Sequence, residues 1–247
     1  MAGFAHDKVV PLKGSALSKK KQVAEMFDSI AYRYDFLNRF LSVGIDIQWR
    51  KKAIRQLIDS KPQRILDVAT GTADLAIMAA RILQPQQIIG IDISEGMLAL
   101  GRKKLEKERL SGLIVLLNGD SETINFSEDS FDAVTVAFGV RNFQDLDKGL
   151  REIKRVLKPG GKLVVLEFSK PKMPVIKQLY QVYMNYVAPI IGKLFCKNRN
   201  AYKYLDESIQ KFPEGKNFTA ILDQLGYLKT YCKPLSFGIC SIYCGEK

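Results

Sequence analysis

Three carboxylates stand at the ends of three consecutive β-branched runs in the first half of this 247-residue chain. Asp67 closes RILDV, Asp92 closes IIGID, and Asp120 follows LIVLLNG. If these runs are neighbouring parallel strands, their carboxyl ends meet at one edge of a sheet, where ligands of open α/β sheets bind. A single strand-end aspartate is also a common helix cap. The ordered set of three predicts a site whose carboxylates accept hydrogen bonds from the hydroxyl and amine groups of one ligand.

The turn after the first run consists of small residues, from Ala69 to Ala73. Small side chains let a ligand lie against the backbone, and the helix that follows offers free N–H donors. In the dinucleotide-binding pattern G-x-G-x-x-G, the three glycine positions here hold Ala69, Gly71 and Asp74. A negative charge at the place of a pyrophosphate argues against NAD, so a cationic cofactor without phosphate fits the turn better.

The elements that must hold these residues alternate between strands and helices. We expect strands over 64–68, 88–92, 113–119, 131–138 and 162–168, and helices near 74–83, 95–108 and 145–157. This alternation is typical of βαβ units, in which helices cover both faces of a parallel sheet. A Pro-Gly-Gly turn at 159–161 precedes the fifth strand, and the tail predicts a helix over 217–225 and two closing strands around Pro234.

The two remaining segments differ from this pattern. Residues 1–18 are polar and predict a loose leader, after which apolar residues from Val23 to Leu41 recur at three- and four-residue steps. That spacing predicts one helix or a pair of helices, followed by a second helical stretch over 46–59. Residues 174–195 are rich in aromatic and aliphatic side chains, which predicts an inserted helix or two.

The strand-end aspartates and the small turn together resemble the S-adenosylmethionine-dependent methyltransferases of the seven-stranded, Rossmann-like class. Five further stretches narrow the resemblance to the C-methyltransferases of menaquinone and ubiquinone biosynthesis. They are YDFLNRFLSVGIDIQW (34–49), AFGVRNF (137–143), RVLKPGGKLVVLEFSKP (155–171), and YRYD with YKYLDESI (32–35 and 202–209). The resemblance runs from about residue 21 to the C-terminus.

This resemblance implies an α/β fold with a Rossmann-like seven-stranded sheet, an N-terminal helical lid and a helical insertion. It divides the chain into a flexible leader (1–20), a lid (21–60) and a methyltransferase domain (61–247), with 174–211 as a helical substrate cover. The implied cofactor is S-adenosyl-L-methionine, without a metal. Its expected contacts are Asp67, Thr70, Gly71, Thr72, Asp92, Ile93, Asp120, Ser121 and Ala137.

The implied reaction is methyl transfer to a ring carbon of a demethylated polyprenyl quinol, most of all demethylmenaquinol to menaquinol. The naphthoquinol preference rests on VAEMFDSIAYRYDFLNR and GDSETINF. The ring carbon becomes electron-rich when the quinol loses a phenolic proton, and a cationic arginine stabilises the phenolate. The implied catalytic residues are Arg141, Asn142 and Tyr34, with Asp35, Glu167 and Ser169 as further polar groups.

The chain departs from the family pattern at four positions. Leu37 and Asp46 stand where Met and His are usual, and Ala73 stands where Gly is usual. Ala137 replaces a serine of some members, which removes a hydroxyl contact to the cofactor.

The chain carries 38 Lys+Arg against 26 Asp+Glu, a net charge of +12 with its one histidine neutral. Such a charge favours an anionic partner, and beside a polyprenyl substrate we expect an anionic membrane surface rather than nucleic acid. The apolar insertion fits a cover that contacts the membrane, a homodimer interface or an ordinary core helix. Two other functions stay open: an RNA methyltransferase, suggested by the basic charge, and a non-catalytic quinone- or lipid-binding subunit with the same fold.

The four cysteines, Cys196, Cys232, Cys240 and Cys244, form no C-x-x-C pair, and His6 is distant in sequence. This pattern predicts reduced, mostly buried thiols rather than a zinc site. Neither an apolar run of about 20 residues nor an N-terminal signal segment is evident. The expected localisation is the cytoplasm, with contact at the inner face of the cell membrane.

Overall fold

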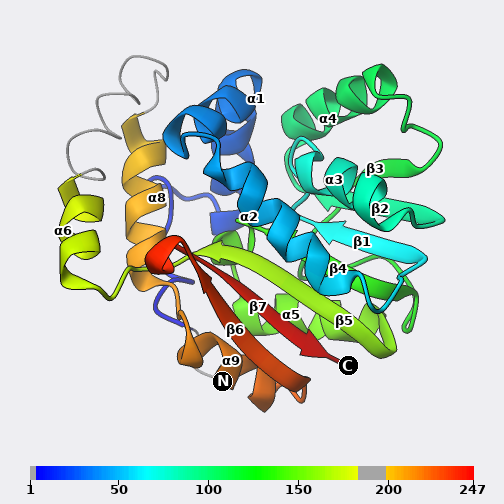
Figure 1. Cartoon of the computed structure of the whole chain (residues 1–247). Helices are drawn as coiled ribbons and strands as arrows, with labels where there is room; N and C mark the ends of the chain where they lie inside the picture. Colours follow the sequence, from blue (N-terminus) through cyan, green and yellow to red (C-terminus); the bar gives the residue numbers. More distant parts are fainter. Residues whose placement is uncertain (1–3, 183–198) are drawn as a thin grey trace.

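A seven-stranded sheet forms the centre of the molecule in a computed structural model that describes residues 4–182 and 199–247 (Figure 1). The strands are β1 (Arg64–Val68), β2 (Gln87–Asp92), β3 (Ile114–Asn118), β4 (Phe131–Ala137), β5 (Leu157–Phe168), β6 (Leu228–Leu235) and β7 (Cys240–Glu246). They lie in the order β3-β2-β1-β4-β5-β7-β6, with β7 antiparallel to both of its neighbours. The Rossmann-like α/β sheet predicted from the sequence is therefore confirmed.

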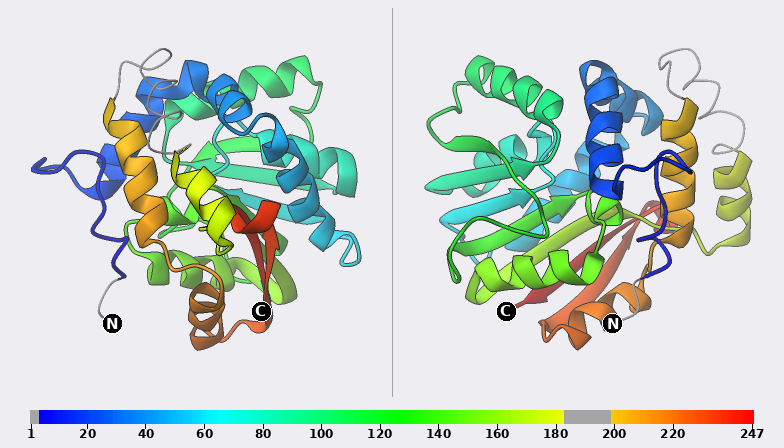
Figure 2. Two further views of the ribbon diagram at one scale, coloured as in Figure 1. Left: turned by 60° about the vertical axis from the view of Figure 1, so that its left-hand side comes forward. Right: turned by 180° about the vertical axis from the view of Figure 1, so that it is seen from behind.

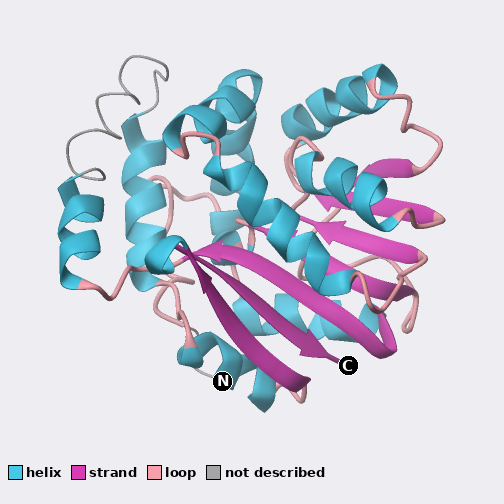
Figure 3. Ribbon diagram, in the orientation of Figure 1, coloured by secondary structure: helices cyan, strands magenta, loops and turns pink. Residues whose placement is uncertain are grey.

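Helices cover both faces of this sheet (Figure 3). They are α1 (Lys19–Leu41), α2 (Ile45–Ile54), α3 (Asp74–Leu83), α4 (Glu95–Lys107), α5 (Leu146–Val156), α6 (Pro174–Val182), α8 (Arg199–Lys211) and α9 (Lys216–Gln224), with the short turns η1 (Arg55–Leu57), η2 (Val140–Asn142) and η4 (Ser236–Gly238). Successive strand residues point to opposite faces. Ile65 accordingly joins the core formed with α2, α3 and α4, whereas Leu66 joins the core formed with α5 and α9.

The fifth strand differs from its prediction. It begins at Leu157 instead of residue 162, so the Pro-Gly-Gly sequence lies inside the strand. Its register against β4 shifts between Phe131 and Ala133, and Gly160 has a φ of +75°, a left-handed conformation that favours glycine. The expected turn is therefore a bulge in a continuous strand.

The closing strands form the predicted hairpin, but the chain reverses at η4 rather than at Pro234. Pro234 lies within β6, opposite Ser241 of β7. Because β6 is at the edge of the sheet, a proline without an N–H donor is tolerated there.

The N-terminal segment was expected to be loose, yet its described residues pack against the body of the molecule. His6 is fully buried, with its ring edge-on to Phe212 at 5.5 Å between centroids. The Lys19 ammonium donates to the carbonyl of His6 at 2.9 Å and to that of Arg141 at 3.4 Å. The segment thus folds back beside η2, a tertiary contact that local polarity could not reveal (Figure 2).

The predicted insertion is described only in part, as α6 and α8. Residues 183–198, with the predictions for that stretch and for Cys196, lie outside the described residues. Cys240 and Cys244 are buried free thiols, and Cys232 is a half-buried one. No helix in the described ranges has the length and apolar character that crossing a membrane requires.

Candidate active site

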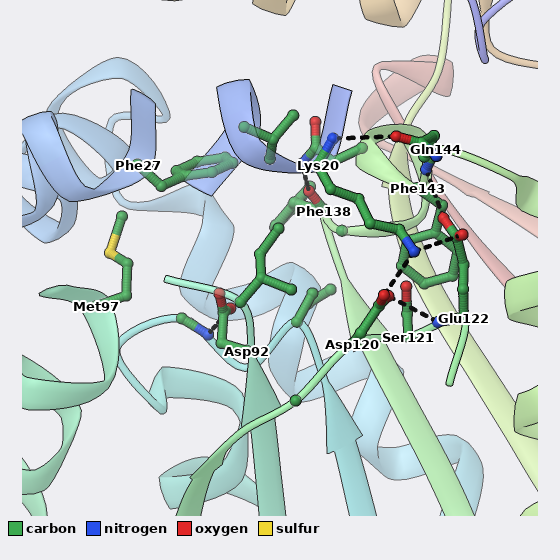
Figure 4. A pocket seen from close by; sticks show the side chains of 18 of the residues that line it. Lys20, Phe27, Asp92, Met97, Asp120, Ser121, Glu122, Phe138, Phe143 and Gln144 are labelled. Carbon is green, nitrogen blue, oxygen red and sulfur yellow. Dashed lines mark hydrogen bonds and ion pairs between the residues drawn. The ribbon is translucent and has the colours of Figure 1, made fainter. Parts of the chain in front are cut away.

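A cavity lies beneath α1, at the edge where the parallel strands end (Figure 4). Its empty volume, part of which is open to solvent, is about 640 Å³. One wall comes from α1, which contributes Lys20, Val23, Phe27 and Tyr34. The other walls come from the loops that follow β1, β2, β3 and β4.

Asp67 shapes the loop after β1 from below. Its side chain is buried, and its two oxygens accept hydrogen bonds from the hydroxyls of Thr70 and Thr135, each at 2.6 Å. Burial raises the pKa of Asp67 to about 6, and these hydroxyl bonds oppose the rise. Because neither Asp67 nor Thr70 lines the cavity, the pair fixes the turn instead of facing a ligand.

Asp92 is placed to bind a ligand directly. Its Oδ2 accepts the N–H of Gly71 at 2.8 Å, and its Oδ1 accepts the N–H of Ser94 at 2.9 Å. Burial raises its pKa, while these backbone donors lower it. Each carboxylate oxygen keeps a second lone pair, and the group lines the cavity. Asp92 can therefore accept two hydrogen bonds from a vicinal diol such as that of a ribose.

The loop after β3 brings a second carboxylate into the cavity, already paired with the lid. The Lys20 ammonium lies 2.5 Å from Asp120 Oδ2 and 2.7 Å from Glu122 Oε2. Glu122 is buried, and its other oxygen accepts the N–H groups of Gln144 and Asp145. Lys20 thus balances two acidic groups at the end of the cavity where Asp120 and Ser121 lie (Figure 4).

Helix α1 reaches the loops after β2 and β1 as well. Asp28 accepts the hydroxyl of Ser94 at 2.5 Å and the N–H of Gly96 at 2.9 Å, after β2. Further along, Asp35 accepts the hydroxyl of Thr72 at 2.6 Å, after β1. The lid is therefore anchored in turn to the loops of β3, β2 and β1.

The anchor at the first loop is an ionic network. Lys104 of α4 donates to Thr72 at 2.9 Å and pairs with Asp35 at 2.5 Å and with Asp74 at 2.7 Å. Arg39 lies 3.0 Å from Asp74 and also pairs with buried Asp46. Burial alone would raise the pKa of Asp74, but these cations lower it. Asp74 therefore belongs to a neutralised network and is not the free negative charge that the sequence suggested at this turn.

The loop after β4 carries the implied catalytic residues in two different settings. Asn142 lines the cavity, as does Tyr34 of α1. The Arg141 guanidinium is buried, donates to Glu167 Oε1 at 2.8 Å and to the Phe138 carbonyl, and lies over the Phe168 ring. Burial raises the pKa of Glu167, and the Arg141 charge opposes that rise. Arg141 is not among the residues that line this cavity.

The cavity brings together eight of the residues named from sequence: Tyr34, Gly71, Asp92, Ile93, Asp120, Ser121, Ala137 and Asn142. Four others, Asp67, Thr70, Thr72 and Arg141, lie behind its wall in hydrogen bonds or ion pairs. Ser169 lies against η4 and β7, where its hydroxyl donates to the Gly238 carbonyl at 2.7 Å and lies 2.9 Å from the Ser241 hydroxyl. Sequence reasoning missed the lining residues Lys20, Phe27, Met97, Glu122, Phe138 and Phe143. For Glu122, the one available signal was its position directly after Asp120 and Ser121.

The polar groups that line the cavity fit a nucleoside cofactor. Asp92 offers free lone pairs for a ribose, and the left-handed Gly71, with φ of +57°, has no neighbour within 4 Å of a Cβ position, so the loop leaves open space there. Asp120 supplies a further acceptor for an exocyclic amine. Over the described ranges no cluster of His, Cys, Asp and Glu could hold a metal ion.

The sequence is similar to those of known methyltransferases. The sequence profile of the ubiE/COQ5 methyltransferase family matches residues 15–247. A demethylmenaquinone methyltransferase of Bacteroides fragilis is 47% identical over 244 residues, covering 99% of each chain. The ubiquinone/menaquinone biosynthesis C-methyltransferase UbiE of Geobacter sulfurreducens is 46% identical over 230 residues, covering 93% of this chain and 90% of that one.

Among solved structures, a SAM-dependent methyltransferase from Thermotoga maritima superimposes with a TM-score of 0.60 at 19% identity. The alignment covers 90% of this chain and 99% of that one. At this identity the likeness concerns the fold alone.

Proposed function

The chain belongs to the ubiE/COQ5 methyltransferase family, and on this premise we propose that it methylates a ring carbon of a demethylated polyprenyl quinol, converting demethylmenaquinol to menaquinol. The observation that carries the proposal is the family match over residues 15–247. The structure supports it with a cavity at the strand ends. There the carboxylates of Asp92 and Asp120, which can accept hydrogen bonds from a ribose and an amine, lie in the same cavity as Asn142. The relatives named above act, by their names, in the same biosynthesis.

S-adenosyl-L-methionine, when bound, supplies a methyl group activated by a sulfonium charge. We assign Asp92 to the ribose hydroxyls, and Asp120 with Ser121 to the adenine. Gly71 and Ala137 give the cofactor close access to the backbone. Asp67, Thr70 and Thr72 act indirectly, because their polar atoms hold the loop and the lid in place.

The quinol must lose a phenolic proton before its ring carbon can attack the methyl group. Asn142 and Tyr34 line the cavity and can bond the quinol oxygen, while Arg141 contributes a positive charge from behind the wall. Burial raises the pKa of Tyr34, which keeps its hydroxyl a donor at neutral pH. A guanidinium stays protonated, so Arg141 acts by its charge rather than as a base, and both the phenolic proton and the proton of the methylated ring carbon pass to water.

A polyprenyl substrate has to reach this cavity from a membrane, and the far end of the lid has a surface suited to that. Val43, in the turn between α1 and α2, is 83% exposed, and Ile45 and Ile47 in the first turn of α2 are 44% and 42% exposed. Lys51 and Lys52 are exposed in the same helix. Apolar side chains beside cations favour an anionic bilayer surface. We therefore propose that this lid tip docks on anionic lipid.

The membrane proposal is tested by flotation with vesicles of phosphatidylglycerol and phosphatidylcholine. We expect the wild type to float with the anionic vesicles, and Val43→Asp with Ile47→Asp to abolish flotation. Leu228→Asp is the control, since Leu228 is 60% exposed on the edge strand β6. Equal flotation of both variants would contradict the lid tip as the contact.

The activity is tested by incubating purified protein with methyl-labelled S-adenosylmethionine and a prenylated demethylmenaquinol. The expected result is label in the quinone ring and release of S-adenosylhomocysteine. A folded protein that binds the cofactor but labels neither a naphthoquinol nor a benzoquinol would overturn the proposed reaction.

A further inference from the structure

A tyrosine of α8 touches one of the implied catalytic residues from outside the cavity. The Tyr204 hydroxyl donates a hydrogen bond to Asn142 Oδ1 at 3.1 Å. Tyr204 is 3% exposed and lies in the YKYLDESI stretch, for which the proposed function has no role. The bond joins the predicted substrate cover to the loop after β4, and α8 lies beside the N-terminal part of α1 (Figure 2).

The Asn142 side chain needs such a partner to present one defined face. An asparagine amide carries an acceptor on one side and donors on the other, and rotation about its last torsion exchanges them. Asn142 Nδ2 makes one long bond, to the Phe138 carbonyl at 3.4 Å. A hydroxyl donor at Oδ1 selects the orientation in which the oxygen faces α8 and the NH₂ group is turned away from it.

Tyr204 can hold this orientation across the working pH range. Burial raises its pKa well above the usual value for tyrosine, with Arg141 opposing and Glu167 reinforcing the rise. The hydroxyl therefore remains a protonated donor. The main chain of the same loop is held independently, because the Asn142 N–H bonds the Gly139 carbonyl at 2.9 Å. Loss of the Tyr204 hydroxyl should release the amide and leave the loop in place.

We propose that Tyr204 is a positioning residue for methyl transfer, whose hydroxyl sets the orientation of the Asn142 amide in the cavity. The inference rests on the proposed function, since it assigns Asn142 a contact to the reacting quinol. It also links the order of α8 to catalysis, because the amide is correctly turned only when α8 lies against η2.

The test is Tyr204→Phe, which removes one hydroxyl and keeps the ring. We expect kcat to fall about 10- to 100-fold, the scale of a misplaced catalytic group, and the Kd for S-adenosylmethionine to change less than twofold. Tyr227→Phe is the matched control: Tyr227 is equally buried, and its hydroxyl bonds the Leu150 carbonyl at 2.8 Å on the α5 side of the sheet. This control should keep the wild-type kcat.

A double-mutant cycle separates positioning from a general loss of structure. In an Asn142→Ala background, Tyr204→Phe should lower kcat no further, because the amide it positions is absent. An equal loss in both backgrounds, or a Tyr204→Phe enzyme as active as the wild type, overturns the inference. An inactive wild type would instead overturn the proposed reaction, so the two failures are distinguishable.

Discussion

The Thr72 hydroxyl donates to Asp35 Oδ1 across 2.6 Å, which joins the turn after β1 to the helix that covers it. Thr72 is 2% exposed and its hydroxyl also accepts from Lys104 at 2.9 Å. A residue that sequence reasoning assigned to the cofactor is thus part of the closure of the cavity.

Weakening the Asp35 anchor should speed release of the product cofactor. Asp35→Asn removes the charge that pairs with Lys104 and leaves a weaker acceptor for Thr72, a loss of about 1 kcal/mol from the closed lid. We expect S-adenosylhomocysteine to leave about fivefold faster in a stopped-flow displacement experiment. Asp147→Asn is the control, because Asp147 forms an exposed pair with Arg151 on α5. A release rate equal to that of this control would contradict the anchor.

Asp92→Asn should weaken cofactor binding. Charged hydrogen bonds contribute about 1.5–3 kcal/mol, so the Kd for S-adenosylmethionine should rise about 10- to 100-fold in a calorimetric titration. Asp132 offers a matched control at the opposite edge of the sheet, where its carboxylate also accepts two backbone N–H groups, those of Gln63 and Arg64. The prediction fails if Asp132→Asn raises the Kd as much as Asp92→Asn does.

Breaking the buried pair of Arg141 should lower both stability and turnover. Glu167→Gln leaves the guanidinium without its counter-charge, and removal of one partner of a buried pair costs about 3 kcal/mol or more. We expect unfolding at lower urea concentration and a lower kcat in the folded enzyme. Glu108→Gln, at the exposed pair with Arg81, should change the free energy of unfolding by under about 1 kcal/mol. A normal kcat in folded Glu167→Gln would restrict Arg141 to a structural role.

The buried His6 should make the protein less stable in acid. Burial, with a smaller contribution from Lys19, lowers its pKa to about 3, whereas an unfolded chain protonates it near 6.5. Between these values only the unfolded state takes up the proton, so the stability that His6 contributes is full above about 6.5 and is lost as pH falls. The loss at pH 5 is about 2 kcal/mol.

His6→Leu removes this titration. Its free energy of unfolding should exceed that of the wild type at pH 5 by more than it does at pH 7. Urea melts of both proteins at the two pH values provide the measurement. Parallel changes in the two proteins would contradict the buried, neutral imidazole.

The helices and strands were predicted accurately from the sequence where local residue patterns determine them. A β-branched run gives β1 at 64–68, and the small turn with Asp74 gives α3 at 74–83, with the bounds that the sequence predicted. The bulge in β5 was missed because a Pro-Gly-Gly sequence is compatible with both a turn and a bulge. Only the pairing with β4 decides between them.

The site was predictable to the extent that it follows strand ends. Asp92 and Asp120 face the cavity because Asp92 ends β2 and Asp120 lies two residues after the end of β3. Lys20 could not be found this way, since its partner Asp120 is 100 positions distant in the chain. Thr72 and Arg141 have the right place in the sequence, but partners from α1 and β5 engage their polar atoms.

Helix α1 is continuous and stiff, so its three anchors at Lys20, Asp28 and Asp35 are mechanically coupled. Lys20 and Asp35 are separated by about 22 Å at the usual rise of ~1.5 Å per residue. A helix of that length rotates as a rigid body rather than bending. Release of the anchor at one end should therefore also move Asp28 away from the loop after β2. The cover should therefore swing as a unit, and substitutions at two anchors should give effects that are not the sum of the separate ones.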